Sequence, residues 1–369
     1  LQDGVAATYP PIDGVPAVKK EASRFIKNFL DLDVDAANCI PTVGSMQGAF
    51  ASFMICGHTN KEKDTVLFID PGFPVHKFQT KILGLKMESF DIYEYRGEKL
   101  REKLESIFST GKIHSVLYSN PNNPTWVCLT NEELKIIGEL ANKYDVIILE
   151  DLAYFGMDFR KDYSHPGVAP FQPTVGKYTD NYILMLSTSK AFSYAGERCA
   201  VLGISNKLAE RRYPDLKEFC GQEIFLRGII FVALHPLSSG TSHSAQYAVA
   251  GVMKAVNDGT YNYRDDVLEY GEKAKMMKDA FTSNGFKFTY DEDLGEPIAD
   301  GFYFTYYYPG FTGAELLEKM LYYGISAISL DTCGSTRQGI RACTSLIQRD
   351  EIPVLAERLK RFAEDHPIK

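Results

Sequence analysis

The chain has 369 residues, of which 45% are hydrophobic and 24% are charged, and its net charge is −8. This length suits two domains, and acidic charge spread along the whole chain excludes the basic surface of a nucleic-acid-binding protein. No apolar run approaches the ~20 residues of a membrane span, and the opening LQDGVAATYPP lacks a signal-peptide pattern.

The seven cysteines and seven histidines show no metal-binding spacing. The number of cysteines is odd, and the sequence has neither a Cys-x-x-Cys pair nor a His-x-x-x-His pair. Free thiols in a reducing compartment are the simplest explanation. We therefore expect a cytoplasmic protein without a metal site.

Strand-like and helix-like segments alternate from Cys39 onward. Amphipathic helical patterns separate most of the strand-like runs, and Thr130 is placed to cap one of these helices, which starts at Asn131. Strands rich in Val, Ile and Leu between helices predict an α/β fold with a mainly parallel sheet, whose ligands bind beyond the carboxyl ends of the strands. The strand-like runs lie at 64–70, 86–92, 113–119, 146–151, 182–189 and 200–205.

The pattern of segments changes near Tyr261. A long helical stretch precedes short strand-like runs at 286–291, 302–308, 325–330 and 339–345, and an amphipathic helix closes the chain from Asp350. We predict a large α/β domain over 10–260 and a smaller α+β domain over 261–369, which the N-terminal segment 1–9 is expected to join.

Lys190 follows the last strand-like residues of the run 182–189. Ser187 and Ser189 precede it, and Arg198 comes eight residues later. A lysine amine can form a Schiff base with an aldehyde. Serine hydroxyls and a guanidinium can hold a phosphate dianion. The group therefore suits a phosphorylated aldehyde cofactor.

Polar side chains also follow two other predicted strands. Asp151 ends the run 146–151, Tyr154 comes three residues later, and Asn123 lies in the turn after the run 113–119. A lone Asp at a strand end is commonly a cap or a turn former. A carboxylate facing a pyridinium nitrogen, however, makes the ring an electron sink. Tyr154 and Asn123 could donate hydrogen bonds to a phenolic oxygen of the same ring.

Two further segments are compatible with a flat phosphorylated ligand. Gly44, Ser45 and Met46 lie between a strand-like run and a helical stretch, where backbone N–H groups at a helix start can point at an anion. Phe73 follows another strand, and its ring could lie against a flat cofactor. Each signal is weak alone, and their order along the chain gives them weight.

Together these motifs resemble the fold-type I enzymes that use pyridoxal 5′-phosphate (PLP), specifically the class I/II aminotransferase family. The resemblance covers nearly the whole chain and implies that Lys190, Asp151 and Tyr154 are catalytic. It implies that PLP contacts Gly44, Ser45, Met46, Phe73, Asn123, Asp151, Tyr154, Ser187, Ser189, Lys190 and Arg198.

The resemblance also implies how the substrate and a second subunit contribute. Arg341, in Gly-Ile-Arg, resembles the family's arginine that grips the substrate α-carboxylate, and Asn123 and Trp126 would lie beside that substrate. Tyr9 resembles the tyrosine that reaches the phosphate of the neighbouring subunit, so a homodimer is expected.

Two features depart from the family's pattern. Trp126 stands where the family's Asn-Pro-Thr-Gly motif has its glycine. A positive φ there would strain Trp126, and otherwise its ring is expected to narrow the mouth of the site and shape substrate choice. The family's N-terminal arm before Tyr9 is not found, which predicts that part of the active-site wall is absent from this sequence.

The implied reaction is a ping-pong transfer of an amino group between an α-amino acid and a 2-oxo acid, with Lys190 as Schiff base and proton shuttle. Two alternatives stay open: a PLP-dependent carbon–sulfur β-lyase, and a non-catalytic regulator that binds PLP or an amino acid. The expected partners are small-molecule substrates, with no nucleic acid and no membrane. An acidic substrate would need a second cation, for which the sequence offers no position. Trp126 and the tyrosine-rich run 302–308 hint at a bulky or apolar substrate, although such tyrosines are more typical of a core.

Overall fold

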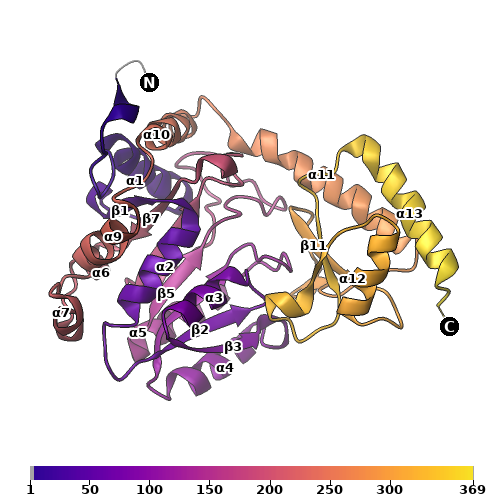
Figure 1. Ribbon diagram of the computed structural model, residues 1–369, viewed down its shortest axis with the longest axis horizontal. Coiled ribbons are helices and arrows are strands. Elements are labelled where there is room, and N and C mark those ends of the chain that lie inside the picture. Colours follow the sequence, from indigo (N-terminus) through magenta and orange to yellow (C-terminus); the bar gives the residue numbers. More distant parts are fainter. Residues whose placement is uncertain (1–3, 369) are drawn as a thin grey trace.

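The structure is a computed structural model that describes residues 4–368, and it has a larger and a smaller part (Figure 1). A seven-stranded sheet forms the centre of the larger part, and a four-stranded sheet forms the centre of the smaller one. This arrangement confirms the predicted α/β fold with a smaller α+β part. No helix within residues 4–368 is long and apolar enough to cross a membrane.

The large sheet consists of β1 (Cys39–Thr42), β2 (Thr65–Asp70), β3 (Lys86–Asp91), β4 (Ile113–Ser119), β5 (Ile147–Asp151), β6 (Tyr182–Ser187) and β7 (Ala200–Ile204). Their order across the sheet is β1-β7-β6-β5-β4-β2-β3. The strands from β6 to β3 pair in parallel, whereas β7 runs antiparallel to both of its neighbours. The sheet is therefore mainly parallel, as predicted.

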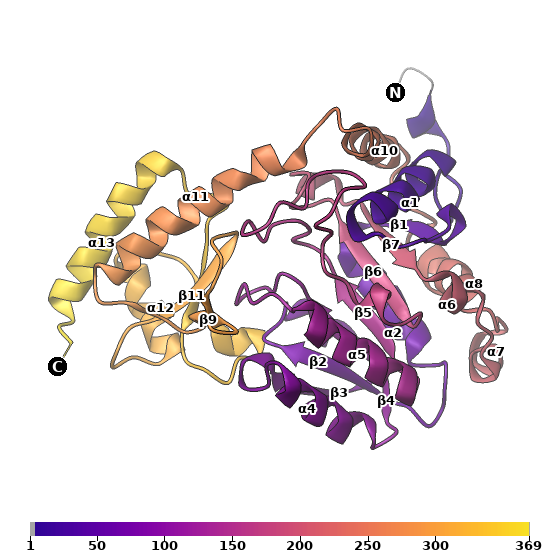
Figure 2. The same cartoon turned by 180° about the vertical axis from the view of Figure 1, so that it is seen from behind.

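Helices cover both faces of the large sheet (Figures 1 and 2). The first face packs against α1 (Pro16–Leu30), α4 (Glu98–Phe108), α5 (Asn131–Tyr144) and α10 (His243–Asn257). The opposite face packs against α2 (Gly44–Cys56), α6 (Asn206–Glu210), α7 (Pro214–Cys220) and α8 (Phe225–Arg227), which continues through a π-helical segment (Gly228–Leu234) into α9 (His235–Ser238).

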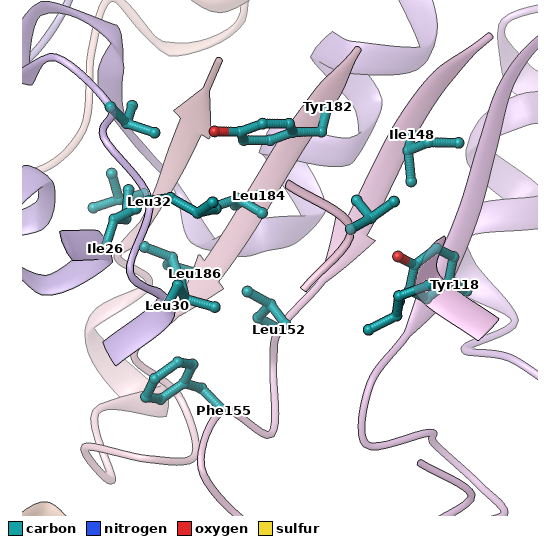
Figure 3. Close-up of a cluster of buried hydrophobic side chains, with 14 of the residues drawn as sticks. Ile26, Leu30, Leu32, Tyr118, Ile148, Leu152, Phe155, Tyr182, Leu184 and Leu186 are labelled. Atoms are coloured by element: carbon teal, nitrogen blue, oxygen red, sulfur yellow. The ribbon is translucent and has the colours of Figure 1, made fainter. Parts of the chain in front are cut away.

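Burial on both faces explains the apolar strand sequences. Every residue of β2, β5, β6 and β7 is buried. Successive residues of β5 alternate between the two cores, since Ile148 packs on the first face and Ile147 and Leu149 on the other. Figure 3 shows the first core, where Leu184 and Leu186 of β6 lie beside Ile26 and Leu30.

The start of α5 follows the predicted cap. The Thr130 hydroxyl accepts a hydrogen bond from the Glu133 N–H, at 3.2 Å, and the Glu133 carboxylate accepts one from the Thr130 N–H, at 3.0 Å. This reciprocal capping box supplies partners for backbone N–H groups that lack them inside the helix. The prediction that Thr130 caps this helix is confirmed.

The smaller part contains β8 (Lys287–Phe288), β11 (Tyr303–Tyr307), β12 (Ile328–Ser329) and β13 (Ile340–Cys343), in the order β12-β13-β11-β8 and all antiparallel. Its core packs against α11 (Tyr263–Thr282), α12 (Gly313–Tyr322) and α13 (Ile352–Asp365). A short hairpin of β9 (Glu292–Asp293) and β10 (Glu296–Pro297) precedes β11.

Helix α11 belongs to both parts. Its first residue, Tyr263, is buried in the core of the large part, whereas Met277 and Phe281 are buried in the core of the small part. One helix therefore runs from the large part into the small part. The predicted domain boundary between residues 260 and 261 stays a prediction.

The N-terminal segment lies on the large part. The His243 ring on α10 is 3.1 Å from the Thr8 carbonyl oxygen, measured from Nδ1, and Figure 1 shows this end of the chain beside α10. The expectation that segment 1–9 joins the small domain is therefore wrong for residues 4–9, and residues 1–3 lie outside the described part. The reason is local, because Pro10 and Pro11 pack near Gly240, just before α10.

Candidate active site

Four neighbouring parallel strands, β6, β5, β4 and β2, end at the same edge of the large sheet. The loops that leave them carry Lys190, Tyr154, Asn123 and Phe73. Together with side chains from α2 and the small sheet, these residues line a cavity of about 280 Å³. The sequence-predicted residues that line it are Ser45, Met46, Phe73, Asn123, Asp151, Tyr154, Ser187, Ser189, Lys190, Arg198 and Arg341.

Lys190 is partly buried at the centre of this group. Its Nζ lies 4.7 Å from the centroid of the Phe302 ring. Burial lowers the pKa of the Lys190 ammonium, and the positive charges of Arg341 and Arg198 lower it further. A lowered pKa increases the share of neutral amine, which is the form that attacks a carbonyl and accepts a proton.

One end of the cavity presents hydrogen-bond donors and a positive charge, which suit an anion. Helix α2 begins at Gly44, whose φ is 69°, and no side chain caps its first N–H groups. A Cβ at Gly44 would lie only 2.4 Å from Nη2 of Arg198, so glycine lets the guanidinium approach the helix start. Unpaired N–H groups next to a guanidinium form a phosphate site. Ser187 Oγ borders this end and accepts a hydrogen bond from the Ser189 N–H, at 3.2 Å.

Asp151 is buried at the end of β5, where one carboxylate oxygen accepts a hydrogen bond from the Ala153 N–H at 3.1 Å. The other oxygen lies 3.7 Å from Nε2 of His76. His76 is buried on α3 (Val75–Ile82), and its ring meets the Phe73 ring edge-on at 5.5 Å. Sequence reasoning missed His76. The available signal was its position three residues after Phe73, in the turn that leads into α3, where the His76 N–H donates to the Phe73 carbonyl at 3.3 Å.

Arg341 comes from the small sheet and faces the same cavity. Its Nη1 donates a hydrogen bond to Asn123 Oδ1 at 2.8 Å, and its guanidinium carbon lies 4.2 Å from the centroid of the Tyr303 ring. The Tyr303 hydroxyl accepts a hydrogen bond from the Tyr154 hydroxyl at 3.1 Å. Tyr303, also missed from the sequence, therefore links the two parts of the site. Burial raises the pKa of Tyr154 well above its usual value, so its hydroxyl stays protonated.

Trp126 lies behind the site and does not line it. The indole is fully buried and packs edge-on against Tyr154 at 5.3 Å and Tyr303 at 6.2 Å. Its φ is 65°, the left-handed conformation in which a tryptophan is strained. The structure therefore meets the first expectation, strain at a positive φ, and the alternative, a ring that narrows the mouth of the site, does not apply because the indole does not line the cavity. A Cβ at Gly301 would lie 2.2 Å from the indole, so this glycine makes the space that the ring fills.

Tyr9 stands apart from the cavity and is 87% exposed. Its expected contact with the phosphate site of a second subunit stays a prediction.

The sequence as a whole matches one family. The model described as "Aminotransferase class I and II" matches residues 1–359. The chain belongs to the class I and II aminotransferase family. Members of this family are PLP-dependent transaminases, and PLP is the cofactor of this chain.

Two relatives indicate how far the similarity extends. The chain is 29% identical to a probable aspartate aminotransferase from Methanocaldococcus jannaschii, over 75% of this chain and 67% of that protein. It is also 29% identical to the glutamate-pyruvate aminotransferase AlaC from Escherichia coli, over 57% of this chain and 49% of that protein. The aligned part is thus about half of AlaC.

Solved structures share the fold. An aminotransferase from Mycobacterium tuberculosis superposes with a TM-score of 0.78 at 16% identity, covering 99% of this chain and 88% of that one. An aspartate aminotransferase from Thermotoga maritima gives a TM-score of 0.76 at 18% identity, covering 97% and 84%.

The residues present fit PLP. The helix start beside Arg198 suits its phosphate, the buried Asp151 carboxylate suits its pyridine nitrogen, and the lowered pKa of Lys190 suits a covalent link to its aldehyde. Across residues 4–368, no group of three His, Cys, Asp or Glu side chains is arranged to hold a metal ion.

Proposed function

We propose that this aminotransferase moves an amino group between an α-amino acid and a 2-oxo acid in a ping-pong cycle. The observation that carries the proposal is one cavity that unites the Lys190 amine, the Asp151 carboxylate and the Arg341 guanidinium. An amine of lowered pKa, an electron-sink partner and a carboxylate clamp are what α-proton transfer on an amino acid needs.

Each residue has a distinct task in this proposal. Arg341 binds the substrate α-carboxylate, and its hydrogen bond to Asn123 and its stacking on Tyr303 fix the direction of the guanidinium. Lys190 takes the proton from the substrate Cα and later returns a proton, since burial favours its neutral form. PLP, when bound, supplies the electron sink that stabilises charge at Cα. The Asp151 carboxylate would hold the pyridine nitrogen in its protonated form, and Nε2 of His76 lies 3.7 Å from the second oxygen of that carboxylate.

The test combines a chemical and a kinetic measurement. PLP-loaded protein treated with borohydride should carry the cofactor's mass on the peptide that contains Lys190, and Lys190→Ala should carry none. Initial rates with an amino acid and a 2-oxo acid should give parallel double-reciprocal lines. Pyruvate and ammonia formed from an S-alkylcysteine without any 2-oxo acid would instead identify a carbon–sulfur β-lyase and contradict transamination.

We also propose that the protein acts as a homodimer in which Tyr9 reaches the phosphate site of the second subunit. The support is its exposure of 87%, which leaves a large aromatic side chain without a core of its own. Gel filtration should show a dimer. Tyr9→Phe should weaken PLP binding without changing the elution volume, and a fully active monomer would contradict the proposal.

We further propose that the protein works in the cytoplasm. All seven cysteines are free in the chain, which is the state that a reducing compartment maintains. Thiol labelling of protein purified without reductant should report seven free thiols after unfolding.

A further inference from the structure

We infer that the amino acid accepted by this site has an uncharged side chain, and that Ile328 selects against an acidic one. This inference rests on the proposed transamination and deepens it, because it names the substrate class. The inferred substrate differs from the acidic substrate in the names of the M. jannaschii and T. maritima aspartate aminotransferases, which this chain resembles.

The first argument is the charge of the cavity wall. Among the described residues that line the cavity, the arginines and lysines are Lys190, Arg198 and Arg341. Lys190 is the covalent anchor, Arg198 lies at the phosphate end, and Arg341 is the clamp for the α-carboxylate. Each of these cations has its own task, so this wall leaves none for a second substrate carboxylate.

Beyond this wall, Arg358 lines a neighbouring cavity that Ile328 and Arg341 also border, and it donates a hydrogen bond to the Gly324 carbonyl at 2.7 Å. Lys77 approaches the rim on the other side of Cys333. It lies next to Gly334, where a Cβ would come within 2.5 Å of its Nζ, and Gly334 follows Cys333 of the cavity wall. Lys77 forms a salt bridge with Asp70, whose side chain is only 3% exposed. Because Asp70 already neutralises Lys77, this lysine cannot pair with a substrate carboxylate without leaving a buried aspartate unpaired.

The second argument is the residue beside the clamp. In the register of β12 and β13, Ile328 stands directly opposite Arg341. Residues opposite each other in an antiparallel pair project from the same face of the sheet, so the isoleucine lies beside the guanidinium. Ile328 also lines the cavity and is 39% exposed. The uncharged wall continues through Cys333 and Tyr303.

This wall treats the two kinds of substrate differently. An apolar side chain beside the clamp buries surface against Ile328, which is favourable. A second carboxylate at the same place loses water and gains no cation, which is costly. The site therefore selects against acidic amino acids because their second carboxylate finds no cation in this wall.

The first experiment compares substrates on the PLP-loaded protein. Single-turnover change in cofactor absorbance would be followed with leucine and methionine, and with aspartate and glutamate. We expect kcat/KM to be about 100-fold higher for the uncharged pair, the scale set by leaving one charged group unsatisfied. A higher value for aspartate or glutamate would overturn the inference.

A cation added beside Arg341 should shift the substrate preference toward acidic amino acids. Ile328→Lys places an ammonium beside Arg341, and the partly exposed position can hold a lysine stem. The ratio of kcat/KM for glutamate over leucine should rise about 10-fold or more. Ile82→Lys is the matched control, because it makes the same substitution at a residue that is 76% exposed and lines no cavity bordered by Ile328 or Arg341, so the added charge should leave the ratio unchanged. An equal ratio in all three proteins would overturn the role of Ile328.

Binding of unreactive acids separates this inference from the proposed function. Dissociation constants of 4-methylpentanoate and glutarate for the PLP-loaded protein would be measured by calorimetry. Tighter binding of 4-methylpentanoate supports the uncharged wall even if no amino acid is transaminated, in which case only the proposed function fails. Tighter binding of glutarate overturns the inference even if transamination is observed, and would assign a cation to a second subunit.

Discussion

Glu150 offers a direct test of how burial controls charge in this protein. It precedes Asp151 on β5 and is fully buried, with hydrogen bonds from the Thr174 hydroxyl at 2.5 Å, the Tyr118 hydroxyl at 3.1 Å and the Val175 N–H at 3.2 Å. Burial raises the pKa of Glu150 to about 7, although the three hydrogen bonds oppose the shift. Glu150→Gln keeps the shape and removes the titration.

The sign of the effect follows from the raised pKa. The folded protein holds the Glu150 proton more tightly than the unfolded chain, whose glutamate titrates near 4.5. Its contribution to stability is therefore complete below pH 4.5 and is lost as the pH rises to about 7. A shift of this size corresponds to about 3 kcal/mol, at ~1.4 kcal/mol for each pH unit.

The assay is calorimetric unfolding of the wild type and of Glu150→Gln between pH 4.5 and 8. The free energy of unfolding of the variant should gain about 3 kcal/mol relative to the wild type across this range. For a chain of this length the gain equals about 4 °C in Tm. Because the two proteins share every other titrating group, the difference between their free energies of unfolding reports on Glu150 alone. A constant difference in Tm at all pH values would refute the reasoning and mean that Glu150 is ionised throughout.

Two glycine substitutions test close approaches in the site. Gly44→Ala should weaken PLP binding about 10-fold or more, measured by titration of the apoprotein, because the new methyl group meets Arg198 and the residue keeps a positive φ. Gly301→Ala should lower the free energy of unfolding by about 1–3 kcal/mol in chemical denaturation, because its Cβ overlaps Trp126. Gly196→Ala, where the new methyl group meets open space, is the control for both, and an equal effect there would contradict these explanations.

The strand-end residues were predictable from sequence because parallel strands bring their carboxyl ends together. Once β4, β5 and β6 were recognised as neighbouring buried runs, Asn123, Asp151 and Lys190 had to lie at one edge.

The rest of the site depends on contacts that no local pattern encodes. Ile328 joins the site because it pairs with Arg341 in the small sheet, and Tyr303 joins it because it pairs with Cys343, two residues further along β13. The sequence shows that Trp126 replaces a glycine of the family's motif, but it does not show where the indole points. The space for that ring is left by Gly301, which is far along the chain. A glycine that permits a distant aromatic ring gives no sequence signal without the fold.

The contacts of Arg341 have a further consequence for recognition. An arginine in solution samples many rotamers, and fixing it costs up to about 2 kcal/mol of side-chain entropy. Here the Tyr303 ring and the Asn123 amide immobilise the guanidinium before any ligand arrives. That ordering is completed during folding, so an incoming carboxylate meets a rigid receptor and retains more of its intrinsic affinity. Even a very small monocarboxylate should therefore compete measurably with the full substrate.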